Sequence, residues 1–148
     1  CNIPATLLVI GDDDNKPYLR SIKKFSLEKR VVFLGPRSDV ASFMKSSDLL
    51  VHPAREEAAG NIIIEALVSG LPTLVSSEVG FSSVVLNFQS GEVVEGDFNQ
   101  DKYNSILGEY LSSKRLISIK NSIKPLANED YFYSRFRFIA DFIEKTFQ

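Results

Sequence analysis

The sequence has few of the residues from which metal and disulfide sites are built. Its 148 residues include one cysteine, Cys1, one histidine, His52, and no tryptophan. A single cysteine cannot form an internal disulfide, and one cysteine with one histidine cannot make a Cys/His zinc site. These counts argue against a disulfide-stapled secreted domain and favour a reducing, cytoplasmic setting.

Long apolar runs and an excess of either charge are missing as well. The longest apolar runs, such as LLVI at 7–10, are far shorter than the roughly 20 residues that span a membrane, and no stretch resembles a signal peptide. The formal net charge is -2, and no basic run stands out. A nucleic-acid partner is therefore not expected, whereas peripheral contact with a membrane stays open.

The sequence does contain a regular alternation of two patterns. Short runs rich in aliphatic residues predict strands, and between them apolar residues recur three and four positions apart, as in helices. After residue 97 only the helical pattern continues. The predicted strands are 5–11, 31–35, 49–53, 72–77 and 91–96, and the predicted helices are 17–28, 38–48, 60–70, 82–89, 99–113, 115–127 and 131–147.

This alternation predicts an α/β fold, a doubly wound parallel sheet with C-terminal helices, because apolar strands joined by helices bury both faces of a sheet. The helix limits have matching signals. Ser38 or Asp39 can cap the second helix, and Gly70 followed by Pro72 ends the third. With 44% hydrophobic residues and no linker or repeat, a single domain over 1–148 is expected.

The loops that follow the strands are the candidate site, because ligands of an open parallel sheet bind beyond the carboxyl ends of its strands. The loop HPAREEAAG at 52–60 is the richest, since it brings two acids and a glycine to the start of a helix. The amides of Ala59, Gly60, Asn61 and Ile62, together with the positive end of the helix dipole, favour an anion such as a phosphate.

Two glutamates flank these amides. Glu65 lies about one and a half turns into the helix, from where its carboxylate can accept hydrogen bonds from a ribose diol. Glu57, in the loop, can meet the hydroxyls of a second sugar. Glutamates near a helix start are usually surface residues that offset the dipole. Here the preceding strand, the glycine at the helix start and the Gly-Leu-Pro after the helix favour a binding role.

The segment HPAREEAAGNIIIEALVSGLPTLVSSEVGF at 52–81 resembles the signature block of the family 4 (group 1) retaining glycosyltransferases. That family's pattern is P-x-x-x-E, a small or aromatic residue, glycine, four residues, E-A, then G-x-P and a later glycine. The segment at 31–53 is similar to the preceding part of the family, and EEAAG before an aliphatic run is closest to bacterial lipopolysaccharide core glucosyltransferases. The matching residues are Pro53, Glu57, Gly60, Glu65, Ala66, Gly70, Pro72 and Gly80.

The resemblance implies a hexosyltransferase, and within it the nucleotide-sugar-binding, Rossmann-like C-terminal half of a two-domain GT-B enzyme. The expected reaction moves a hexose, glucose above others, from a UDP-sugar to a glycan or lipopolysaccharide-core acceptor with retention of configuration. The expected setting is the bacterial cytoplasm, with peripheral contact at the inner membrane left open. No metal cofactor is expected, because members of the family work without one.

The same resemblance implies roles for individual residues. Glu65 would bind the nucleotide ribose, and Glu57 would act as the catalytic residue that contacts the donor sugar near the reacting centre. The amides of Ala59 to Ile62, with Ala58 beside them, would bind the diphosphate. The loop bearing Arg37 would lie along the nucleobase, uracil above others, through its backbone or its side chain. Ala59 stands where many members have an aromatic residue, which leaves the donor sugar open.

The chain enters a strand-like run within a few residues, and the upstream strand and basic loop that the family uses to grip the diphosphate do not precede it. We therefore interpret it as a fragment without the N-terminal acceptor domain and the first strand of its own domain, inactive by itself. The aromatic tail at 131–147 is predicted to pack in the core, or to dock on the missing domain or a membrane surface. Its aromatic residues include Phe136, Phe138, Phe142 and Phe147.

Two other functions fit parts of the sequence. A GT-B nucleotide-sugar epimerase shares the fold and the diphosphate site, but it would need histidine and carboxylate bases that this half lacks. A phosphate-switched receiver or nucleotide-sensing module would place magnesium at the acidic run 12–14, where a solvated turn before Pro17 is the simpler interpretation. His52 is expected to fix its loop rather than to contact a ligand, and Arg55 and Glu56 are expected to be exposed.

Overall fold

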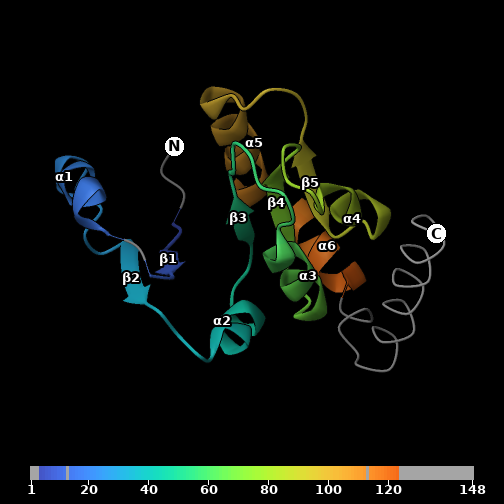
Figure 1. Ribbon diagram of the computed structural model, residues 1–148, viewed down its shortest axis with the longest axis horizontal. Coiled ribbons are helices and arrows are strands. Elements are labelled where there is room, and N and C mark those ends of the chain that lie inside the picture. The colour runs from blue at the N-terminus through green and yellow to red at the C-terminus, as the bar shows by residue number, and fades with distance from the viewer. Residues whose placement is uncertain (1–3, 13, 113, 124–148) are drawn as a thin grey trace. The chain divides into compact units, whose positions relative to one another are not determined.

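The computed structural model describes residues 4–12, 14–112 and 114–123, which form an α/β chain. The chain divides into two compact units, Cys1–Ser42 and Phe43–Gln148. Each unit has its own parallel sheet, with two strands in the first and three in the second (Figure 1). The α/β class and the parallel strand pairing predicted from the sequence are confirmed.

The first unit is a single strand–helix–strand crossover. Strand β1 (Leu7–Ile10) pairs in parallel with β2 (Val31–Gly35), and helix α1 (Lys16–Lys24) connects them. Just before α1, the backbone N–H of Lys16, its first residue, accounts for one contact of the acidic run, because it donates a hydrogen bond to the Asp14 carboxylate at 3.1 Å. Asp12 and Asp14 are exposed, as in the solvated turn predicted for this run. Asp13 lies outside the described residues.

The second unit contains the sheet that organises the candidate site. Its strands lie in the order β3-β4-β5, and both pairs are parallel, with His52 opposite Val75 and Val75 opposite Val93. Helix α2 (Val40–Ser46) leads into this unit across the boundary with the first. The other elements are β3 (Leu50–His52), α3 (Asn61–Val68), β4 (Thr73–Ser76), α4 (Ser82–Asn87), β5 (Gly91–Val94), α5 (Gln100–Ser112) and α6 (Arg115–Ile123).

Helices cover both faces of this sheet, and alternate strand residues supply the two halves of the core. Val75 and Val93 pack with α3 and α4, whereas their neighbours Leu74 and Val94 pack with Tyr103 of α5. Figure 1 shows α5 on the other side of β4 from α4. All four residues of β4 are buried, as expected for a central strand that is covered on both faces. The doubly wound arrangement predicted from the sequence is therefore present in this unit.

Helix α3 ends where the sequence predicts. Gly70 adopts the left-handed conformation, with φ of 68°. Its backbone N–H donates to the Leu67 carbonyl at 3.0 Å, and the Leu71 N–H donates to the Ala66 carbonyl at 2.9 Å. This pair of hydrogen bonds is the Schellman motif, which satisfies the last carbonyls of a helix. The carbonyl of Pro72 then accepts a hydrogen bond from Leu50 and starts the pairing of β3 with β4.

The observed elements lie close to the predicted ones. Each predicted strand contains an observed strand, and the first six predicted helices correspond to α1 to α6, with α6 described as far as Ile123. The predicted tail helix at 131–147 and its aromatic residues lie outside the described residues. None of the described helices has the length and hydropathy that a membrane-spanning helix requires.

The buried Tyr103 hydroxyl connects α5 to the sheet, and its proton makes the free energy of unfolding depend on pH in the alkaline range. The Tyr103 side chain is 1% exposed, and its hydroxyl donates to the Leu74 carbonyl at 2.6 Å. Burial raises the pKa of Tyr103, and a hydrogen bond with the His52 backbone opposes that rise. Burial also raises the pKa of Tyr110, to about 12. Both groups therefore keep their protons in the folded state when the unfolded chain has lost them.

We predict that Tyr103→Phe lowers the free energy of unfolding by about 1 kcal/mol near neutral pH, because the hydrogen bond from the Tyr103 hydroxyl to the Leu74 carbonyl is lost. The folded pKa lies above the unfolded one, so the contribution of the Tyr103 proton is complete below about pH 10 and is lost as the pH rises further. The difference between parent and variant should shrink at alkaline pH in urea unfolding. The exposed control Tyr18→Phe should change stability near neutral pH by less than about 0.5 kcal/mol. A constant difference across this range would contradict the prediction.

Candidate functional site

The loops after β3, β4 and β5 meet at one edge of the second sheet, because the carboxyl ends of neighbouring parallel strands lie together. The β3–α3 loop and the β4–α4 loop are joined through their backbones. The Glu57 N–H donates to the Glu78 carbonyl at 3.0 Å, and the Glu57 carbonyl accepts from Gly80 at 3.0 Å. Phe81 donates to the Ala59 carbonyl at 2.9 Å. The two loops therefore form a short parallel ladder beyond the sheet, centred on a bridge between Glu57 and Val79.

This ladder brings the loops so close that two of its positions require glycine. A Cβ atom on Gly80 would overlap the Ala58 carbonyl oxygen, and one on Gly60 would overlap the Val79 side chain. Gly60 also has φ of 78°, in the left-handed region that side chains disfavour. Both glycines belong to the segment that the sequence singled out, and the structure supplies the steric reason for each.

Gly60 is also the N-cap of α3, and the backbone there presents several unused donors. The Gly60 carbonyl accepts from Ile63 at 2.9 Å. Within the described part of the chain, no carbonyl accepts a hydrogen bond from the N–H groups of Ala59, Gly60, Asn61 or Ile62. Ala58, Ala59 and Asn61 are exposed and Ile62 is half-buried, while Gly60 itself is buried. These amides and the dipole of the eight-residue helix favour an anion at this edge.

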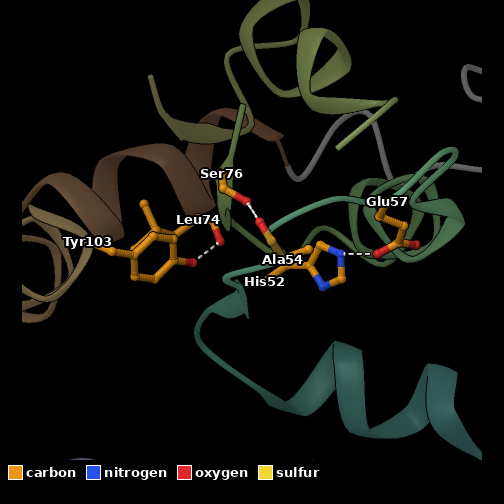
Figure 2. A network of polar contacts seen from close by, with 6 residues as sticks. All are labelled: His52, Ala54, Glu57, Leu74, Ser76 and Tyr103. Carbon is orange, nitrogen blue, oxygen red and sulfur yellow. Dashed lines mark hydrogen bonds and ion pairs between the residues drawn. The ribbon is translucent and has the colours of Figure 1, made fainter. Parts of the chain in front are cut away.

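The side chain of Glu57 is fixed by His52. His52 Nε2 lies 2.6 Å from Glu57 Oε2, and the two side chains are 21% and 38% exposed. Figure 2 shows the imidazole at the end of β3 pointing toward the carboxylate on the following loop. A second contact in the same loop runs from the Ser76 hydroxyl to the Ala54 carbonyl. Glu57 is thus held at its backbone by the ladder and at its carboxylate by a histidine.

The other predicted site residues differ in how they are held. Glu65 of α3 is exposed, and no other described residue forms a hydrogen bond or ion pair with its carboxylate, which therefore stays available to a ligand. Glu56 is exposed, unlike its half-buried neighbour Glu57. Arg55 is exposed, as expected, but its guanidinium lies over the Phe98 ring at 5.6 Å, which links the β3–α3 loop to the loop after β5.

Arg37 belongs to the first unit, in the loop between β2 and α2. Its guanidinium forms a two-pronged ion pair with Asp39, at 2.8 Å from Nε and 2.7 Å from Nη2. The hydrogen bond from Arg37 lowers the pKa of the Asp39 carboxyl, although both groups are exposed. Asp39 directly precedes α2, the position predicted for a cap.

Sequence reasoning singled out the loop at 52–60 as the candidate site but did not predict which side chains support it. The Tyr103 and Ser76 hydroxyls both contact backbone carbonyls of this region, and neither was expected to do so. His52 was expected to fix its loop, and the structure shows that it contacts Glu57 in particular. The one available signal was a lone histidine at a strand end, five positions before the glutamate.

Comparison with known proteins assigns the chain to a family. The sequence profile described as "Glycosyl transferases group 1" matches residues 2–124, most of the chain. The chain belongs to the group 1 glycosyltransferases. It is 33% identical over 110 residues to the lipopolysaccharide glucosyltransferase WaaG of Escherichia coli K12, covering 74% of this chain and 29% of that enzyme. This glycosyltransferase chain therefore spans less than a third of the length of that relative.

Solved structures agree with this assignment. The crystal structure of WaaG, described as a glycosyltransferase of lipopolysaccharide biosynthesis, superposes with a TM-score of 0.76 at 30% identity over 83% of this chain and 34% of that one. Anabaena HepE in complex with UDP-glucose superposes with a TM-score of 0.70 at 25% identity over 98% of this chain and 42% of that one. The fold of this glycosyltransferase chain is accordingly the Rossmann-like fold found in GT-B enzymes.

We predict that Gly80→Ala destabilises the chain by about 1–3 kcal/mol, because its Cβ must displace the Ala58 carbonyl from the loop ladder. Gly108→Ala is a matched control. A Cβ at that helical position meets nothing within 4 Å and should raise stability by about 0.5–1 kcal/mol. Urea unfolding of both variants measures the difference, and a Gly80→Ala variant as stable as the parent would show that the loops do not approach so closely.

Proposed function

We propose that this chain is the donor-binding half of a bacterial glycosyltransferase that moves glucose from UDP-glucose to a sugar hydroxyl of a lipopolysaccharide-core-like glycan, with retention of configuration. One observation carries the proposal. The unused amides at the start of α3 and the fixed carboxylate of Glu57 belong to the same loop at one edge of one sheet. The amides match an anion and the carboxylate matches sugar hydroxyls, and a nucleotide sugar joins these two groups in one ligand.

In the proposed complex the diphosphate lies against the N–H groups of Ala59 to Ile62. The positive end of the α3 dipole stabilises its charge, and the left-handed Gly60 lets the phosphate oxygens approach the backbone closely. Backbone amides recognise the diphosphate whatever base or sugar it carries. This part of the site therefore sets the class of donor, a nucleoside diphosphate sugar.

Two glutamates and one loop give the donor its orientation. Glu65 accepts hydrogen bonds from the ribose diol, and Glu57 accepts them from the hydroxyls of the hexose. The resemblance to the family assigns the uracil to the loop bearing Arg37, whose guanidinium is paired with Asp39. The names of two relatives support glucose and UDP, because one is a glucosyltransferase and the other is solved with UDP-glucose.

The proposed transfer proceeds on one face of the sugar. The acceptor oxygen bonds to the anomeric carbon as the bond from that carbon to the UDP phosphate breaks, and the acceptor proton passes to a leaving phosphate oxygen. We propose that no metal takes part, following the family that the sequence resembles, so chelation with EDTA should leave turnover unchanged. The contacts to the acceptor and the remaining contacts to the diphosphate would come from an N-terminal domain. The chain by itself should therefore show no transfer.

We predict that Glu65→Ala in the full-length enzyme weakens UDP binding about 10- to 100-fold, because two hydrogen bonds from the ribose diol to a carboxylate are lost. Isothermal titration calorimetry with UDP measures the change. Glu109→Ala removes an exposed glutamate from α5, toward the opposite end of the sheet, and should leave the UDP affinity as it is. Equal affinity in the parent and Glu65→Ala would remove the ribose assignment.

We predict that Glu57→Ala in the same enzyme lowers kcat about 100-fold with a smaller effect on UDP binding, because its carboxylate contacts the sugar at the reacting centre. Initial rates of glucose transfer measure kcat, and the configuration of the product at its anomeric carbon tests retention. Glu56→Gln, a change at the exposed neighbour, should keep kcat within about twofold of the parent. A kcat in Glu57→Ala equal to that of the parent would refute the catalytic assignment.

A further inference from the structure

His52, the only histidine of the chain, has a backbone that the sheet fixes. It is the last residue of β3 and pairs with Val75 of the fully buried strand β4. The buried Tyr103 hydroxyl donates to the carbonyl of Leu74, the residue before Val75 in β4. The imidazole therefore projects from a rigid position at the edge of the sheet, whereas Glu57 lies on a loop.

The contact between the His52 imidazole and the Glu57 carboxylate is a short hydrogen bond. An ionised carboxylate can only accept, so the tautomer of His52 with its proton on Nε2 donates to Glu57 Oε2, over 2.6 Å. A hydrogen bond to a carboxylate is stronger and shorter than one between neutral groups. The histidine is the less exposed of the two, at 21% against 38%. Within the described residues no donor reaches Glu57 Oε1, and Figure 2 shows this oxygen on the side away from the imidazole.

We propose that His52 is a positioning residue for Glu57. Its Nε2–H holds one carboxylate oxygen so that the other is oriented, before the donor binds, to accept hydrogen bonds from the hexose hydroxyls. A glutamate on a loop otherwise loses rotamer freedom when a ligand orders it, and a side chain ordered beforehand avoids that cost. The inference rests on the proposed function, since it gives Glu57 the same sugar as its ligand.

Other contacts hold the loop, so the effect of the imidazole can be separated from the shape of the backbone. Glu57 is tied through its own N–H and carbonyl to Glu78 and Gly80, and Ala54 is tied to Ser76. None of these hydrogen bonds involves the His52 side chain. Removing the imidazole should therefore free the Glu57 carboxylate while the α3 amides, and with them UDP binding, stay unchanged.

The test compares UDP with UDP-glucose as probes of the full-length enzyme in the absence of acceptor. His52→Ala should weaken binding of UDP-glucose about 5- to 10-fold and leave that of UDP within about twofold. His52→Gln should recover most of the loss, because its amide can present an N–H near the position of Nε2. In a Glu57→Ala background, His52→Ala should add less than about twofold, because its effect acts through that carboxylate.

The contrary outcomes are distinct. If Glu57→Ala weakens UDP-glucose binding and His52→Ala does not, the positioning role is overturned and the proposed function stands. Equal losses for UDP and UDP-glucose in His52→Ala would show that the histidine maintains the loop, which also overturns it. A loss of the same size with and without Glu57 would show that His52 acts independently of that carboxylate. If Glu57→Ala leaves UDP-glucose binding unchanged, the assignment of Glu57 to the hexose is itself refuted.

Discussion

The backbone ladder between the β3–α3 and β4–α4 loops is the constraint on which the rest of the site depends. It extends the parallel pairing of β3 with β4 past the ends of both strands, because the Glu57 N–H donates to the Glu78 carbonyl and the Gly80 N–H donates to the Glu57 carbonyl. Each such bond contributes only about 0.5–1.5 kcal/mol, but together they give a connecting loop the fixed geometry of a sheet. Because the ladder consists of main-chain groups, it constrains where the side chains start rather than which side chains they are.

The ladder explains why glycine occurs where it does and why α3 begins where it does. Loops at this spacing leave no room for a Cβ on Gly80, and the turn into α3 places Gly60 against Val79 with a positive φ. The turn ends the pairing at Ala59, so the next amides have no carbonyl to meet in the described chain. The close loop contact and the unused donors are two consequences of one backbone path.

How far the sequence predicts this structure depends on the range of the interactions. The strands and the end of α3 were predictable because they follow from local patterns, apolar runs for the first and Gly70 before Pro72 for the second. The contact of Glu57 with His52 was not, although only five positions separate them. It requires the loop shape that residues more than twenty positions later impose. The Tyr103 hydroxyl contacts a carbonyl 29 positions earlier, and its sequence pattern indicates only a helix.

The proposed site divides recognition between backbone and side chains, and the two parts differ in how freely they can change. Main-chain amides bind a diphosphate whatever residues carry them, provided that the ladder and Gly60 keep their conformation. In the proposal the hexose is recognised by side chains, with Glu57 held by a histidine at the strand end and Ala59 adding no bulk. Under this proposal, substitutions at positions 52 and 59 would change binding of the sugar without disturbing the diphosphate. The proposal thus separates a backbone that fixes the class of donor from a few side chains that select its sugar.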